Sequence, residues 1–116
     1  MTDLNTAEPD WSVTIDRATT SDGIDQVQVV VIGAIDPSTT PKLRAAWTAA
    51  LQPPAPHCVR FDLTRVMFCG SHGMRSLVEA ADACEAGGVT MRVLASPPVR
   101  RVAEITHLSE VLHLEP

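Results

Sequence analysis

The run of residues 61–77 sharply narrows the architectures open to this chain. It begins as a short apolar strand pattern, continues through a second apolar step, and reaches the turn Gly70-Ser71-His72-Gly73, after which a helical pattern begins. Such a turn presents a hydroxyl and an imidazole at a helix N-terminus, where free N–H groups and the helix dipole favour an anion such as phosphate. A strand that passes directly into a helix in this way indicates an α/β fold with a candidate site at the turn.

Periodicities along the rest of the chain alternate between strand and helix. Strands are predicted at residues 11–16, 26–32, 58–63 and 89–95, with a short last strand at 111–114. Helices are predicted after the start signal at residues 33–41, from about Ser71 to Ala86, and after the N-cap candidate Ser96. Two opening strands followed by alternating helices and strands predict a mixed β-sheet of four to five strands with about three helices packed on it.

The first predicted helix has one apolar face, formed at helical spacing by Leu43, Ala46, Trp47, Ala50 and Leu51. Trp47 lies on this face, and we therefore expect its side chain to be largely buried. Asp36, just before the helix, is expected to serve as an N-cap or to form an Asx turn.

Length and charge exclude several classes of protein. A chain of 116 residues is long enough for one domain with a real core, which we expect at residues 11–116 after a loose tail at 1–10. With a net charge of −5 there is no basic stripe that would bind nucleic acid directly. No apolar stretch approaches the roughly 20 residues that span a bilayer, and the first residues are polar rather than signal-like. The chain is therefore expected to be cytoplasmic, without membrane insertion.

Two patterns that could carry chemistry do not have the spacing that the chemistry needs. Cys69-Gly70-Ser71-His72-Gly73 resembles a Gly-x-Ser-x-Gly nucleophile elbow, but Cys69 replaces the first glycine and the chain is too short for a hydrolase of that type. Cys69 with His72, and His57 with Cys58, lack the ligand spacing of structural zinc sites. The sequence therefore predicts neither an enzyme nor a bound metal or cofactor, and three cysteines at irregular spacing predict no disulfide framework.

The central run resembles the signature of the STAS domain, the fold of bacterial anti-sigma factor antagonists. In that family a strand ending in Asp-Leu-Ser leads to a Phe-x-Asp-Ser-Ser-Gly turn. Here the corresponding residues are Asp62-Leu63-Thr64 and Phe68-Cys69-Gly70-Ser71-His72-Gly73. Two further segments, Gly33-Ala34-Ile35-Asp36 with Leu43-Arg44 and the strand–Pro–helix run at 93–102, are also similar to the family, so the resemblance covers residues 13–114.

The resemblance implies a binding protein that docks on an anti-sigma factor of the serine kinase type and releases the sigma factor. In the family the second serine of the turn is phosphorylated, whereas here His72 stands at that position and Gly70 replaces the turn aspartate. Ordinary serine phosphorylation control is therefore expected to be absent, with Ser71 the remaining hydroxyl in the turn. His72 is then either a surface residue in a turn that has lost its switch or a pH-sensitive or phosphate-sensitive group.

The resemblance also implies which residues contact the partner. They lie at the start of the first helix and in the turn: Asp36, Ser38, Thr39, Gly70, Ser71, His72, Gly73, Met74 and Arg75. The outer face of the second helix, with Ser76, Glu79 and Asp82, is expected to extend this surface. Within the same fold, the alternative function is that of the STAS subunit of an ABC lipid-transport complex, which would press the turn against an ATPase subunit. Weak homodimer formation is a further expectation.

Overall fold

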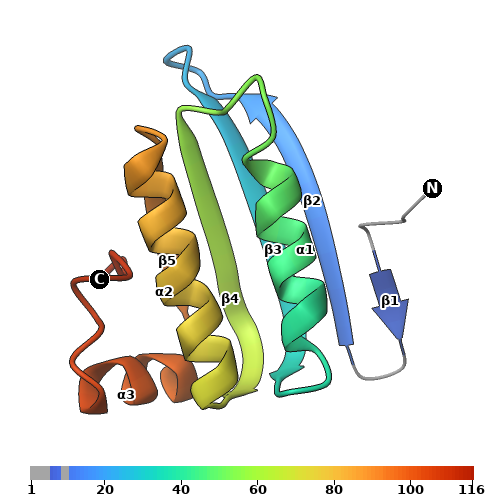
Figure 1. Ribbon diagram of the computed structural model, residues 1–116, viewed down its shortest axis with the longest axis vertical. Coiled ribbons are helices and arrows are strands. Elements are labelled where there is room, and N and C mark those ends of the chain that lie inside the picture. Colours follow the sequence, from blue (N-terminus) through green and yellow to red (C-terminus); the bar gives the residue numbers. More distant parts are fainter. Residues whose placement is uncertain (1–5, 9–10) are drawn as a thin grey trace.

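The computed structural model describes residues 6–8 and 11–116 and contains one mixed sheet with three helices (Figure 1). In chain order the elements are β1 (Thr6–Glu8), β2 (Trp11–Thr19), β3 (Asp25–Ile35), α1 (Thr40–Ala50), β4 (Cys58–Cys69), α2 (Ser71–Ala86), β5 (Thr90–Ala95) and α3 (Pro97–Ile105). The predicted fold class is confirmed, and the bounds of α2 agree with those expected from the sequence.

The five strands lie in the sheet in the order in which they occur in the chain. β1, β2 and β3 pair antiparallel, whereas β3, β4 and β5 pair parallel, so each parallel connection must cross over through a helix. Right-handed crossovers that step in one direction along a sheet place their helices on the same face. Figure 1 shows α1 and α2 side by side in front of the sheet.

The core lies between this face of the sheet and the two helices. Alternate residues of β3 are buried beneath the helices, as period-2 alternation requires: Val27, Val29, Val31, Gly33 and Ile35. The inner stripe of α1 is buried as predicted, with Leu43 fully buried and Trp47 8% exposed. The Nε1 of Trp47 donates a hydrogen bond to Ser76 Oγ on α2 at 3.1 Å, which gives the buried indole N–H its acceptor.

A charged pair on the surface also joins α1 to α2. Arg44 donates two hydrogen bonds to the carboxylate of Glu79, at 3.1 and 2.7 Å, and this guanidinium lowers the pKa of Glu79 below its ordinary value. Both side chains remain more than two-fifths exposed, so this ion pair contributes little to stability compared with the apolar contacts beneath it.

Three segments differ from their predictions. Thr6–Glu8 pair with β2 as strand β1, although a loose tail was expected there, and residues 1–5 and 9–10 of that tail lie outside the described residues. β4 was predicted to end at Leu63 but continues to Cys69. Two register shifts between β3 and β4 keep the residues after Leu63 paired with β3. The last strand predicted at 111–114 is reduced to one bridge, between Val93 and Leu114.

The segment after α3 returns along the outer edge of β5. Val93 donates its backbone N–H to His113 O at 3.2 Å, and Glu115 N donates to Val93 O at 2.8 Å. Glu115 also accepts from Arg60 through its side chain, at 3.3 Å, and from Arg100 through its backbone oxygen, at 2.6 Å. None of the helices in the described part of the chain has the length and apolar character that crossing a bilayer requires.

We expect Trp47→Ala to lower the free energy of unfolding by about 3–5 kcal/mol, because it removes a buried indole that packs between α1 and α2. Trp47→Phe keeps an aromatic ring in the core while removing the N–H that Ser76 accepts and part of the ring volume, so its loss should be smaller than that of Trp47→Ala. Urea unfolding followed by circular dichroism measures both. Equal midpoints for Trp47→Ala and the parent would show that this side chain is not part of the core.

Candidate partner-binding turn

Two loops meet at one end of the sheet because β3 and β4 are parallel and end together. Ile35, the last residue of β3, is the register partner of Cys69, the last residue of β4. Gly70 N then donates a hydrogen bond to Ile35 O at 3.0 Å, which ties the second loop to the first. The start of α1 and the start of α2 therefore lie beside each other, at the lower end of the sheet in Figure 1. The predicted site residues of both segments are brought together.

Gly73 allows α2 to begin directly against the ends of both strands. A Cβ at this position would lie 2.5 Å from Ile35 Cγ2 and 2.8 Å from Cys69 Sγ, closer than atoms in real structures approach. Gly73 and the next residue, Met74, are both buried, Met74 at 3% exposure. These two predicted contact residues therefore support the turn from beneath and do not present side chains to a partner.

The loop before α1 is organised around the carboxylate of Asp36. Its Oδ1 accepts hydrogen bonds from Ser38 N at 2.9 Å, from Ser38 Oγ at 2.7 Å and from Thr39 N at 3.0 Å, so the predicted Asx turn is confirmed. These donors, first of all the Ser38 hydroxyl, hold the pKa of Asp36 below its ordinary value. Thr39, predicted as a contact residue, is buried at 9% exposure and donates its hydroxyl to Ala34 O at 2.8 Å.

At the start of α2 the polar side chains point to solvent. Gly70 is the N-cap, in an extended conformation and without a side chain that could accept from the first turn. Ser71 and His72 are exposed, and within the described residues neither side chain forms a hydrogen bond. Arg75 is exposed one turn later. The turn therefore presents a hydroxyl, an imidazole and a guanidinium at the surface.

Cys69 does not take part in this exposed surface. Its side chain is buried, and burial raises the pKa of the thiol to about 11, so it stays protonated at neutral pH. Within the described part of the chain, no group of three His, Cys, Asp or Glu side chains is arranged to hold a metal ion.

Two large apolar side chains next to the turn were missed by the sequence reasoning. Met67 is 70% exposed and Phe68 is 53% exposed, at the end of β4. The Phe68 ring lies against Gly70, since a Cβ on Gly70 would be 3.3 Å from Phe68 Cε2. An aromatic residue two positions before a Gly-Ser turn was the available signal, but an apolar run is ordinarily interpreted as core.

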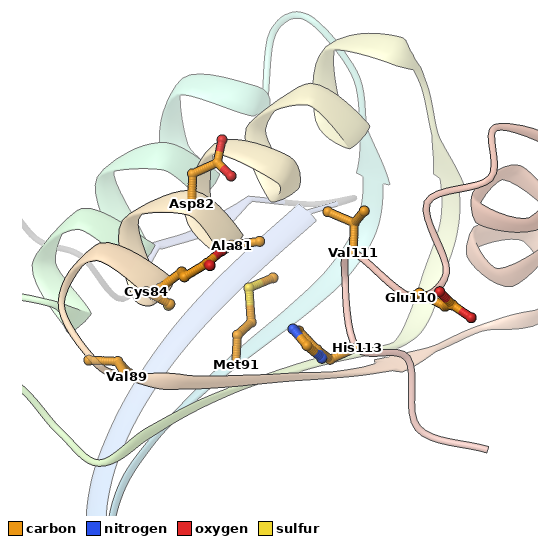
Figure 2. A pocket seen from close by; sticks show the side chains of 9 residues that line it. Ala81, Asp82, Cys84, Val89, Met91, Glu110, Val111 and His113 are labelled. Carbon is orange, nitrogen blue, oxygen red and sulfur yellow. The ribbon is translucent and has the colours of Figure 1, made fainter.

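The outer face of α2 differs from its prediction as well. Ser76 is fully buried beneath Trp47 and cannot extend the contact surface, whereas Glu79 stays partly exposed in its ion pair with Arg44. Asp82 instead borders a groove of about 650 Å³ between the second half of α2, β5 and the C-terminal segment. Figure 2 shows Met91 and His113 projecting into this groove. It begins at Ala81, about 15 Å along the helix axis from Ser71, and is separate from the turn.

Comparisons with known proteins identify the family of this chain. The family model described as STAS domain matches residues 17–116. Among solved structures, the chain is similar to an anti-sigma factor antagonist from Mycobacterium paratuberculosis, with 28% identity and a TM-score of 0.76 over 96% of this chain and 91% of that chain. No curated protein sequence matches.

More distant structures share the fold. The anti-sigma factor antagonist SpoIIAA in its unphosphorylated form has 20% identity and a TM-score of 0.67 over 89% of each chain. Its phosphorylated form, from Bacillus, has 18% identity and a TM-score of 0.64, over 89% of this chain and 92% of that chain. The murine anion transporter Slc26a9 has 15% identity and a TM-score of 0.66, but 92% of this chain matches only 20% of the transporter chain.

Removing the charge of Asp36 should change how stability depends on pH. Folding lowers the pKa of Asp36 below its ordinary value of 3.8, so the ionised carboxylate stabilises the folded protein. This stabilisation is fully present at a pH above 3.8 and is lost as the pH falls through the pKa of the folded state. Asp36→Asn keeps an acceptor oxygen for the loop but cannot titrate. We expect the parent to lose more stability than Asp36→Asn between about pH 5 and pH 2, measured by urea unfolding at each pH.

All other carboxylates titrate in both proteins, so the difference between the two curves isolates Asp36. Parallel curves over this range would contradict the role of the carboxylate in organising the loop.

Proposed function

Because this chain belongs to the STAS domain family, we propose that it is an anti-sigma factor antagonist, which docks on an anti-sigma factor of the serine kinase type and thereby releases the sigma factor. The observation that carries the proposal is the similarity to the Mycobacterium paratuberculosis antagonist over 96% of this chain and 91% of that one. The match covers nearly the whole of the antagonist but only 20% of the transporter Slc26a9, which favours the function of the antagonist.

The exposed turn supplies the contact surface in this proposal. Ser38 from the loop before α1, and Ser71, His72 and Arg75 from the start of α2, are all exposed, and the hydrogen bond from Gly70 N to Ile35 O keeps the two loops adjacent. The buried residues beneath them are Thr39, Gly73 and Met74. A rigid support of this kind favours recognition without a change of shape in the antagonist.

Control by serine phosphorylation is absent in this proposal. SpoIIAA is described in a phosphorylated and an unphosphorylated form, so phosphate is a modification of that relative. By its resemblance to the family motif, this chain carries an imidazole, His72, where the family has its phosphorylated serine, and the Ser71 hydroxyl one residue earlier is rotated by about 100° around the helix. A kinase positioned to phosphorylate residue 72 therefore does not meet the hydroxyl of Ser71. Binding would then be constitutive.

The proposal is tested with the anti-sigma serine kinases encoded by the source organism, purified and titrated one at a time by calorimetry. At least one should bind, and it should release a labelled sigma factor as the antagonist is added. If every kinase fails to bind the parent protein, the function is wrong.

We expect no phosphate on the turn after incubation with the binding kinase and Mg-ATP. Intact-mass measurement should show an unchanged parent protein, because position 72 has no hydroxyl. His72→Ser serves as the positive control, since it should gain one phosphate and lose affinity for the kinase in the presence of ATP. Stoichiometric phosphate on Ser71 of the parent would refute constitutive binding.

A carboxylate in the turn should imitate phosphate. His72→Asp should leave the fold unchanged or slightly more stable, because a helix N-terminus favours an anion. Its affinity for the kinase should nevertheless fall by roughly 2–5 kcal/mol, the cost of an unpaired charge in an interface. Ser21→Asp adds the same charge in the exposed turn between β2 and β3, at the opposite end of the sheet, and should bind like the parent. Equal affinities for the two variants would place the interface elsewhere.

A further inference from the structure

We infer that Met67 and Phe68 are the apolar anchors by which this chain docks, and that the partner receives them in an apolar pocket bordered by carboxylates. The inference rests on the proposed function, because it assigns the chemistry of the same interface. Phe68 is the first residue of the turn motif and Met67 precedes it; neither stands at the phosphoacceptor position, and both side chains are exposed.

The folded chain leaves both of these large apolar side chains in water. Met67 is 70% exposed and Phe68 is 53% exposed, whereas the neighbouring Val66 and Cys69 are almost completely buried. Folding gains nothing from large apolar side chains that stay in water, but a partner that covers them gains their burial. Aromatic side chains next to a recognition loop are frequent centres of binding energy in protein interfaces.

A β-bulge creates this exposure. Gly33 pairs with Val66 and the next residue of β3, Ala34, pairs with Phe68, so Met67 is an extra residue without a partner in β3. Without the bulge, Met67 would stand opposite Ala34 and Phe68 would take the inward position opposite Ile35. The extra residue therefore turns Phe68 to the face of the sheet away from α1 and α2, and restores Cys69 to the core.

β4 also extends beyond its other neighbour, which leaves the pair uncovered. The last register partners of β4 and β5 are Leu63 and Ala95. The chain then turns into α3, and Ser96 Oγ donates to Val66 O at 2.6 Å. Met67 and Phe68 follow Val66, beyond the last register pair of β4 with β5. Phe68 also lies against Gly70, so the apolar surface is continuous with the turn.

The charges near the pair determine the chemistry of its partner. Arg65 and Phe68 pair with Ile32 and Ala34, alternate residues of β3, so the arginine and the ring lie on one face of the sheet. Arg65 is exposed and forms no ion pair within the described residues. The nearest carboxylate along β4, that of Asp62, accepts hydrogen bonds from Thr64 N at 3.0 Å and Thr64 Oγ1 at 2.6 Å.

Charge on the side of the turn has the same sign. Arg75 is exposed, while the two carboxylates close to it in sequence or space are occupied: Glu79 by Arg44, and Asp36 by its own loop. The anchor surface is thus apolar and locally basic in a chain whose net charge is −5. A complementary partner surface is apolar and acidic, and arginines at the rim would speed association at low salt.

The inference is tested with the anti-sigma kinase that binds the parent protein, by calorimetry and stopped-flow association. Phe68→Ala and Met67→Ala should each weaken binding about tenfold or more. Ile105→Ala is the matched control, since Ile105 is also 70% exposed but lies at the end of α3, and it should bind like the parent. Melting temperatures should be unchanged in all three, because none of these side chains is in the core.

The charged rim has its own pair of variants. Arg65→Gln should slow association several-fold at low salt and reduce the salt dependence of the rate, whereas Arg101→Gln, an exposed arginine on α3, should change neither. Sedimentation of the parent and of Phe68→Ala is measured in parallel to detect self-association.

The possible results distinguish a failure of the anchor assignment from a failure of the proposed function. If the kinase binds the parent, Phe68→Ala and Met67→Ala equally well, the anchor assignment is overturned while the proposed function stands. If the parent is a dimer that Phe68→Ala dissociates, the surface joins two copies of this chain and the assignment of a carboxylate-bordered pocket is overturned. If no kinase binds the parent, the proposed function fails and the anchor assignment fails with it.

Discussion

The parallel pairing of β3 with β4 is the contact on which the rest of this molecule depends. Parallel strands cannot be joined by a tight turn, so this pairing requires α1 as a crossover, and the next parallel step to β5 requires α2 on the same face. It also makes two strands end side by side. The loops that follow Ile35 and Cys69 then share one surface, linked through Gly70 N. Fold and site thus follow from one set of backbone hydrogen bonds.

Sequence patterns were informative where one apolar period continued without interruption. The stripe of α2 and the turn before it predicted the helix from Ser71 to Ala86, and the stripe of α1 predicted the burial of Trp47. The bulge at Met67 was not predictable in this way, since a single inserted residue reverses the inward and outward positions that follow it. Ser76 was missed because its burial depends on a hydrogen bond from another helix.

In the candidate site, too, features that arise from neighbouring residues in the chain were predictable, and features that arise from packing between distant segments were not. The Asx turn of Asp36 was predictable because its donors are two and three residues away in the chain. The burial of Thr39, Gly73 and Met74 depends instead on how closely α1 and α2 approach the strand ends, which no local pattern reports. The exposed part of the candidate site is smaller and less polar than the family motif suggests. Its carboxylates serve the fold, and its apolar and basic groups face outward.

The return of the C-terminal segment along β5 has a consequence for how this protein behaves at high concentration. A parallel edge strand with free backbone groups can recruit strands from other molecules, and native proteins cover or interrupt such edges. Here both outward-facing groups of Val93 are occupied, by His113 O and Glu115 N, and Arg60 and Arg100 hold Glu115 in place. A few residues of the C-terminal segment thereby occupy the middle of the β5 edge, where a strand from another molecule would otherwise pair.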